Sequence, residues 1–226
     1  MKKILALIFV LLMVFSLGAC KKVENTEKTE FGVDDLSSKG REDPETTASD
    51  RGRIFLEEYN KLVKKFGEAK LDDGTLKGVA IVRLFDFTGS GNLCLYVAYA
   101  DGSKPYVNKQ MVCAFDNGLA YLLEKDNSSV GVDITSKESE DDKVPSVWLY
   151  KDNNNKGYIV TGNEMSKAPT YNTYFGSDIF AFQVDSNVSS DGTYEKFDLT
   201  DVSEDDFDEL VEKNEKIIES LKSVIK

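Results

Sequence analysis

The sequence predicts an α+β fold, in which an antiparallel β-meander sheet is flanked by an N-terminal and a long C-terminal amphipathic helix. Apolar residues recur at three- and four-residue spacing over 51–66 and again over 203–225, as they do on one face of a helix. Between these segments, short alternating runs are separated by turn sequences, which is typical of antiparallel strands joined by hairpins. Residues 51–226 are therefore expected to form a single domain.

The first twenty residues have the pattern of an export signal. Lys2 and Lys3 precede an apolar stretch over 4–15, which is shorter than the roughly 20 residues of a membrane span, so residues 1–19 are predicted to be a cleaved signal peptide. The ending Leu17-Gly18-Ala19-Cys20 resembles the lipobox of bacterial lipoproteins, which implies lipidation of Cys20 and anchoring at the outer face of the cell membrane. The alternative is that Cys20 is a thiol in an ordinary export signal.

Residues 20–50 are predicted to contain the lipidated cysteine and a disordered tether. From Lys21 to Asp50 there are nine acidic, five basic and five apolar residues, too few apolar groups to offset the entropy of an ordered chain. Such a segment would hold the domain away from the lipid headgroups.

The charge and composition exclude several function classes. The chain has 40 acidic and 28 basic residues, a formal net charge of −12, which argues against a nucleic-acid partner. It has no histidine, which excludes Ser-His-Asp and Cys-His catalysis and histidine-ligated zinc. The expected partners are the membrane, through the lipid anchor, and an unknown envelope protein or glycan.

The predicted elements follow in chain order. A helix over 51–66 has Asp50 as its N-cap and Gly67 just after its end. Alternating apolar residues predict strands at 79–85, 93–99, 107–115, 119–124, 147–150, 157–161, 178–184 and 193–199. Turn sequences at 116–118 and 152–157 indicate hairpins, and the polar stretch 126–143 indicates a long exposed loop.

The last predicted element is a helix with Ser203 as its N-cap and acidic residues at 204–206, where the helix dipole favours negative charge. Its apolar stripe is wider than a coiled-coil seam, so we expect the helix to pack on the sheet or on the first helix.

A Gly-rich loop between two predicted strands contains the candidate metal ligands. Calcium loops of the D-x-D-x-D-G type bring alternating oxygens together around a glycine turn. The positions in this chain are Asp86, Thr88, Ser90 and Asn92, of which only Asp86 is a carboxylate. We expect a Gly-rich turn without a cofactor, with weak calcium binding as the alternative.

The segment from Asp86 to Gly102 resembles the D-F-D-G-D-G-x-x-E-L…A-Y-x-D-G segment of uncharacterised lipoproteins from clostridia and related Firmicutes. The acidic loop of those proteins is similar to calcium-binding loops of VCBS/FG-GAP-like repeats. If those relatives bind calcium there, the resemblance implies that the site is weakened or lost in this chain, because Thr88, Ser90 and Cys94 replace acidic positions.

Cys94 and Cys113 lie in two strands that are predicted to form a hairpin. If they face each other across it, their Cβ atoms are close enough for a disulfide in an extracytoplasmic compartment. Two buried, reduced thiols are the alternative.

These observations favour a lipid-anchored, extracytoplasmic, non-catalytic binding or interaction domain. One alternative is a carbohydrate-binding or glycoside-hydrolysing surface protein, although no spacing of acids singles out a catalytic pair. The aromatic residues that would stack on sugars, or else pack in the core, are Trp148, Tyr150, Tyr158, Tyr171 and Tyr174. Another alternative is a weak calcium-binding structural module.

Overall fold

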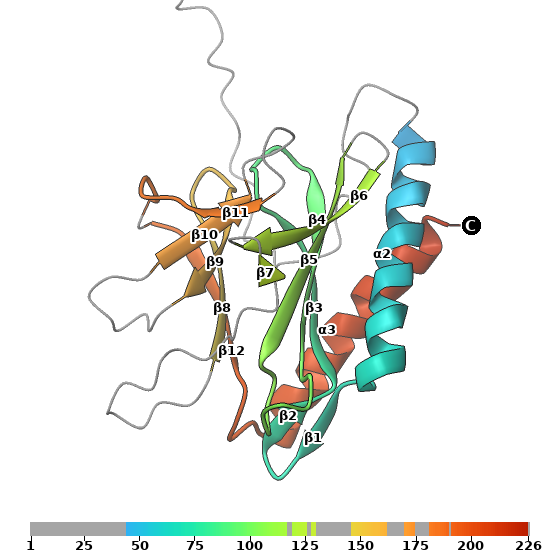
Figure 1. The fold of residues 1–226 in the computed structure, drawn as a ribbon, viewed down its shortest axis with the longest axis vertical. Helices are drawn as coiled ribbons and strands as arrows, with labels where there is room; N and C mark the ends of the chain where they lie inside the picture. Colours follow the sequence, from blue (N-terminus) through green and yellow to red (C-terminus); the bar gives the residue numbers. More distant parts are fainter. Residues whose placement is uncertain are drawn as a thin grey trace, which may run out of the picture. The chain divides into compact units, whose positions relative to one another are not determined.

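The computed structural model describes residues 44–116, 119–125, 128–129, 146–161, 170–174, 181–189 and 191–225. The predicted α+β class is confirmed, with a helix at each end of the described part (Figure 1). The helices are α2 (Pro44–Phe66) and α3 (Glu204–Ser223). The strands are β1 (Lys70–Asp72), β2 (Thr75–Lys77), β3 (Val79–Asp86), β4 (Leu93–Tyr99), β5 (Lys109–Asp116), β6 (Leu119–Lys125), β7 (Ser128–Ser129), β8 (Ser146–Lys151), β9 (Gly157–Thr161), β10 (Thr170–Tyr174), β11 (Ala181–Val184) and β12 (Thr193–Asp198).

The main sheet consists of two antiparallel meanders. Its strand order is β12-β8-β9-β10-β11-β6-β5-β4-β3, with β7 paired to β6. Successive strands are neighbours from β3 to β6 and from β8 to β11, as the hairpin sequences predict. The meanders meet where β11 lies parallel to β6, and β12 returns to pair with β8. The edge strands of the described sheet are therefore β3 and β12.

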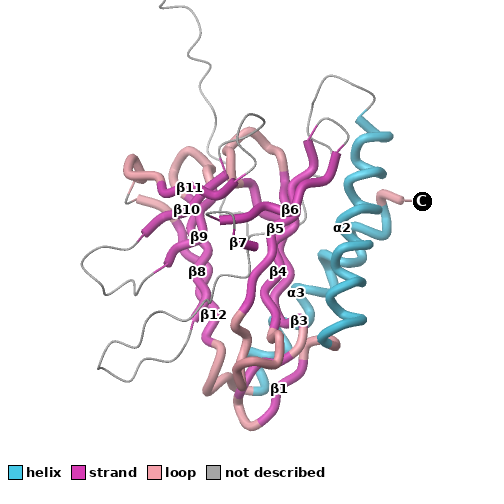
Figure 2. The backbone as a smooth tube through the Cα atoms, viewed as in Figure 1, coloured by secondary structure: helices cyan, strands magenta, loops and turns pink. Residues whose placement is uncertain are grey.

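Strands β3, β4 and β5 are buried on both faces. One face packs against α2 and α3, which lie on the same side of these strands (Figure 2). The opposite face shares a core with residues of β8, β9 and β12, such as Leu149, Ile159 and Phe197. The sheet therefore curls until its two edge strands approach each other, and Arg83 of β3 reaches Glu195 of β12.

Helix α3 confirms its predicted start and its predicted packing. The Ser203 hydroxyl oxygen accepts the backbone N–H of Asp206 at 3.1 Å, which satisfies one of the free donors of the first turn. The apolar stripe packs on α2 and β3. In the same stripe Asn214 accepts the N–H of Val82 at 3.0 Å and donates to the carbonyl of Ala80 at 2.7 Å, so α3 covers the open edge of β3.

Helix α2 corrects the predicted end of the tether. The helix begins at Pro44, so the prediction that residues 44–50 are disordered and that Asp50 is the N-cap is wrong. Proline suits a first helical turn, and Asp50 lies within the helix and pairs with Arg53 at 3.4 Å. A periodic repeat of apolar residues reveals only those helical turns that face the core. The polar first turns of α2 were therefore not predicted. Residues 20–43 lie outside the described residues.

Some short strands were not predicted. The hairpin β1–β2 turns at Asp73 and Gly74, with φ of 50° and 70°, the left-handed pair that Asp-Gly adopts in a tight hairpin. Strand β10 has a polar sequence, Thr-Tyr-Asn-Thr-Tyr, without a clear alternation. The predicted loop 126–143 lies outside the described residues except for β7. In the described part of the chain, no helix is long and apolar enough to cross a membrane.

Candidate functional site

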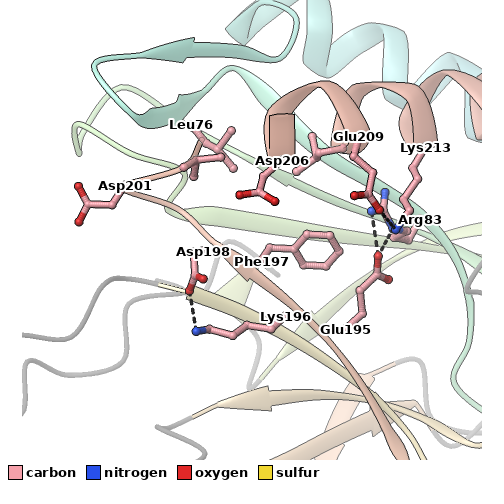
Figure 3. Close-up of a pocket in the computed structure, with 12 residues that line it drawn as sticks. Leu76, Arg83, Glu195, Lys196, Phe197, Asp198, Asp201, Asp206, Glu209 and Lys213 are labelled. Atoms are coloured by element: carbon pink, nitrogen blue, oxygen red, sulfur yellow. Dashed lines mark hydrogen bonds and ion pairs between the residues drawn. The ribbon is translucent and has the colours of Figure 1, made fainter. Parts of the chain in front are cut away.

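A cavity of about 310 Å³ lies where β12, α3 and the edge of β3 meet (Figure 3). It forms there because the curled sheet brings its two edge strands together under one helix. Apolar and charged side chains line it: Leu76, Arg83, Glu195, Lys196, Phe197, Asp198, Asp201, Val202, Asp206, Glu209, Leu210 and Lys213.

Arg83 is held by bonds to three parts of the fold. Its side chain is 1% exposed, and both Nε and Nη2 lie 2.9 Å from Oε1 of Glu195. Its Nη1 donates to the carbonyl of Val82 at 2.7 Å and to the Oδ1 of Asn214 at 2.9 Å. The guanidinium carbon lies 4.8 Å from the centroid of the Phe197 ring. Arg83 therefore ties β3 to β12 and α3, in the multiple-bond geometry that arginine favours at buried sites.

Glu195 is satisfied at only one of its carboxylate oxygens. Oε1 accepts both bonds from Arg83, whereas Oε2 is buried and has no hydrogen-bond partner among the described residues. A buried carboxylate oxygen without a donor is costly, so such an atom calls for an explanation.

The remaining acids come from α3 and from the chain around β12. Lys196 pairs with Asp198 at 2.8 Å, and Lys213 pairs with Glu209 at 2.9 Å. Asp206 accepts the Ser203 hydroxyl at 2.5 Å and forms no ion pair with any residue that the structure describes. Five carboxylates face three cationic groups in the lining, so the cavity has an excess of two negative charges.

The sequence analysis did not single out this cavity, although two signals for it were present. Arg83 interrupts the otherwise apolar run Val79–Phe85. Glu195 alternates with Phe197, so it takes the core-facing side of β12. A charge at a core-facing strand position needs a partner, and here each charge is the partner of the other.

In the loop that contains the candidate metal ligands, the Asp86 carboxylate accepts hydrogen bonds from the loop itself. Oδ1 of Asp86 accepts the N–H of Thr88, the hydroxyl of Thr88 and the N–H of Gly89, each at 2.9 Å. Oδ2 accepts the N–H of Gly91 at 2.6 Å. The hydroxyl oxygens of Thr88 and Ser90 lie 2.5 Å apart, and Asn92 is exposed. The carboxylate therefore closes its own turn, and calcium binding stays a prediction.

Over the described residues, no group of three or more His, Cys, Asp or Glu side chains is placed to hold a metal ion. The acids that line the cavity, and Asp86, therefore do not converge into such a group.

Of the two alternatives for Cys94 and Cys113, the structure has the buried thiols and not the disulfide. Leu95, not Cys94, lies opposite Cys113 in the β4–β5 pair, so the register differs by one residue from the one predicted. A slip of one residue sends a side chain to the other face of a sheet. Cys94 packs in the core towards β8 and β9, and Cys113 packs under the helices. The structure contains both as buried thiols, and burial raises the pKa of Cys113 to about 12.

Two of the predicted sugar-stacking aromatics are core residues. Tyr150 and Tyr158 are 0% and 1% exposed and pack with Val160 on the outer face of β8 and β9. Trp148 is partly buried, with Lys196 5.2 Å from its ring centroid. Beside it Tyr194, which was not predicted to be functional, is 41% exposed. The side chains of Tyr171 and Tyr174, and all of Cys20, lie outside the described residues.

No protein-family model, curated protein or solved structure matches this chain.

Proposed function

We propose that this chain is a lipid-anchored, extracytoplasmic bacterial lipoprotein whose folded domain binds a ligand without catalysing a reaction. The observation that carries the proposal is the sequence Leu17-Gly18-Ala19-Cys20 directly after a basic and then apolar segment. Acyl chains on Cys20 would anchor the protein, because each buried methylene contributes about 0.8 kcal/mol.

The cavity at the β3–β12 edge supports a binding role. Binding sites are concave, largely pre-formed and lined by apolar groups with a few placed polar ones. Here the apolar walls are Leu76, Phe197 and Leu210, and the polar groups include Arg83 and Glu195. The fixed bonds of Arg83 pre-organise this floor, which lowers the cost of ordering on binding.

The anchor is tested by metabolic labelling with a palmitate analogue in a bacterial host. We expect the wild-type chain to incorporate label and to sediment with membranes. The Cys20→Ala variant should lose both properties, whereas Cys94→Ala, which removes a buried core thiol, should keep them. Mass spectrometry of wild-type protein that shows an unmodified initiator methionine would contradict the proposal.

A carbohydrate-binding surface is the second candidate, and the observation that favours it is Tyr194. Its ring packs at a centroid distance of 4.5 Å on Tyr150 and remains 41% exposed beside Trp148. Exposed aromatic rings can stack on sugars. In affinity electrophoresis through cell-wall glycan, Tyr194→Ala should lose any retardation and Tyr194→Phe should keep it. Equal mobility of all three proteins with and without the glycan would exclude this candidate.

A further inference from the structure

We propose that Lys156 and Asp185 become covalently joined, through an amide bond between Nζ and the side-chain carboxyl carbon that forms without an enzyme and releases water. The bond is a cross-link between the turn that precedes β9 and the chain that follows β11. This inference goes beyond the proposed binding function and does not depend on it. The contact between the two groups, their burial and a hydroxyl group beside them lead to it.

The two reacting groups are in contact and are largely withdrawn from water. Nζ of Lys156 lies 2.7 Å from Oδ2 of Asp185, and the two side chains are 20% and 10% exposed. Nζ also lies 5.4 Å from the centroid of the buried Tyr158 ring. In a pair that is shielded from water, a proton can pass from the ammonium to the carboxylate, because burial penalises both charges. The product is a neutral amine, which is a nucleophile, beside a carboxylic acid.

The position of this pair in the fold differs from that of five other lysine pairs. Lys156 and Asp185 are 29 positions apart in the sequence. The other five lysines pair with acids at most five positions away and are between 31% and 66% exposed: Lys61, Lys77, Lys196, Lys213 and Lys216. Those pairs are open to water, whereas tertiary structure brings Lys156 to Asp185.

Both partners are held in place by the backbone around them. The N–H of Lys156 donates to Oδ1 of Asp152 at 2.9 Å, and the carbonyl of Lys156 accepts the N–H of Asp152 at 3.0 Å. Oδ1 of Asp185 accepts the N–H of Asn187 at 2.9 Å, and Oδ2 faces the amine. Groups fixed in contact react as if at effective concentrations of about 10⁵–10⁸ M, which favours a bond that does not form between free amines and acids in water.

The hydroxyl of Tyr158 lies where it can carry a proton during the reaction. It donates to Oδ2 of Asp152 at 3.4 Å and also bonds to the Asp185 carboxylate. Burial, with the charges of Asp152 and Asp185, raises the pKa of Tyr158 well above its ordinary value. The hydroxyl is therefore protonated and can donate to an oxygen that leaves Asp185.

The reaction needs no co-reactant. The pair rests as ammonium and carboxylate, because the hydrogen bond from Lys156 lowers the pKa of Asp185. One Nζ proton passes to the carboxylate, and the Nζ lone pair then attacks the carboxyl carbon to form the N–C bond. The C–O bond to the protonated oxygen breaks, and this oxygen leaves as water with a second proton. Tyr158 relays that proton by giving its own and taking one from Nζ, which keeps its third proton in the amide.

The test compares the masses of the wild-type chain and of Lys156→Arg, each purified at full length in detergent and unfolded before the measurement. Arginine keeps the positive charge and can still pair with Asp185, but its delocalised guanidinium does not attack a carboxyl group. The mass difference between the two chains should exceed the difference between their side chains by one water molecule. The comparison cancels any lipid, since both chains carry the same Cys20.

The matched control is Lys196→Arg. Lys196 also contacts an aspartate, Asp198 at 2.8 Å, but the two side chains are 43% and 48% exposed. This variant should keep the loss of one water. Tyr158→Phe, which removes only the hydroxyl, should slow the appearance of the cross-link in pulse-labelled chain by about 100-fold or more.

Peptide mapping locates the bond. Trypsin should release from wild-type protein a branched peptide that joins Lys156 to Asp185, and it should not cleave after Lys156. This result decides the matter even if Lys156→Arg fails to fold. The inference is overturned if no such peptide is found, if wild type and Lys156→Arg differ only by their side chains, or if the loss of water persists in Lys156→Arg.

Discussion

Asp86 ends β3 and Glu195 lies inside β12. Both carboxylates are partly buried, but their surroundings differ. Asp86 accepts four hydrogen bonds from its own loop, so its two oxygens are satisfied within six residues of chain. Glu195 depends on Arg83, which is 112 residues away in sequence, and one of its oxygens has no described partner. The loop has the residue pattern of a binding motif but satisfies its own carboxylate, whereas Glu195 keeps one buried oxygen without a partner among the described residues.

The difference shows that residue type alone does not make a carboxylate available to a ligand. A short acidic loop rich in glycine satisfies itself whenever its backbone N–H groups can turn inward. Glu195 lies inside β12, and no backbone N–H group of the described residues donates to its carboxylate. Its partner must come from another element or from a ligand.

The largest effect is expected from breaking the Arg83–Glu195 pair. Arg83→Met should lower the free energy of unfolding by about 3–5 kcal/mol, since it leaves the Glu195 carboxylate buried without a counter-charge. Denaturant unfolding measures this loss. The double variant Arg83→Met/Glu195→Met should recover most of the lost stability, because no unpaired charge remains.

The matched control for that pair is Arg53→Met on α2. Arg53 also contacts two carboxylates, Asp50 and Glu57, but its side chain is 52% exposed. The Arg53→Met substitution should lower the free energy of unfolding by less than about 1 kcal/mol, because exposed ion pairs contribute little. If both variants lose the same free energy of unfolding, the buried Arg83–Glu195 pair contributes no more to stability than the exposed pairs of Arg53.

A smaller effect is expected from Asp86→Ala in the self-satisfied loop. Losing the acceptor of three backbone N–H groups should cost about 1–3 kcal/mol, and Asp86→Asn, which retains one accepting oxygen, should cost less. Asp208→Ala on the exposed side of α3 is the control and should change stability by less than about 0.5 kcal/mol. If Asp86→Ala behaves like the control, the loop does not depend on its own carboxylate.

Asp101 is a second carboxylate that accepts its hydrogen bonds from its own loop, and its contribution to stability should depend on pH. The hydroxyl and N–H of Ser103, with Asn108, lower the pKa of Asp101 from 3.8 to about 2. Because the folded-state pKa is depressed, its stabilisation is complete above pH 3.8 and is lost as the pH falls towards 2. The stability advantage of the wild-type chain over Asp101→Asn should therefore disappear across that interval in acid titrations of unfolding. An advantage that is undiminished at pH 2 would contradict this account.

The Gly-rich loop is either a turn closed by Asp86 or a weak calcium site, and the melting temperature in calcium distinguishes the two. The expected effect is smaller still. Since Asp86 closes its own turn, millimolar calcium should leave the melting temperature of the wild-type chain unchanged. A native-state ligand would raise it by mass action. A rise that disappears in Asp86→Asn would establish the loop as a calcium site.

No effect is expected from a reducing agent. The β4–β5 register that sends Cys94 and Cys113 to opposite faces also fixes which side chains line each core. Dithiothreitol should therefore leave the melting temperature unchanged, and both thiols should react with a thiol reagent only after denaturation. A lower melting temperature after reduction would indicate a register shifted by one residue.

Local rules predicted most of the fold. The two helices, the hairpin meander, the Ser203 cap and Gly67 at the end of α2 all depend on residues within a few positions of one another. Elements without a strong apolar alternation, such as β10 and the first turns of α2, were missed because their sequence periodicity is weak.

The sequence by itself determined the α+β class, the order of most elements and the expectation of an anchored amino terminus. Tertiary structure decided the β4–β5 register, the parallel junction of β6 with β11 and the curl that brings β3 against β12. Turn residues and periodicity act over a few residues, whereas register and curl depend on how both faces of the sheet are covered. The cavity belongs to the second group, because Arg83 and Glu195 meet only after the sheet has curled.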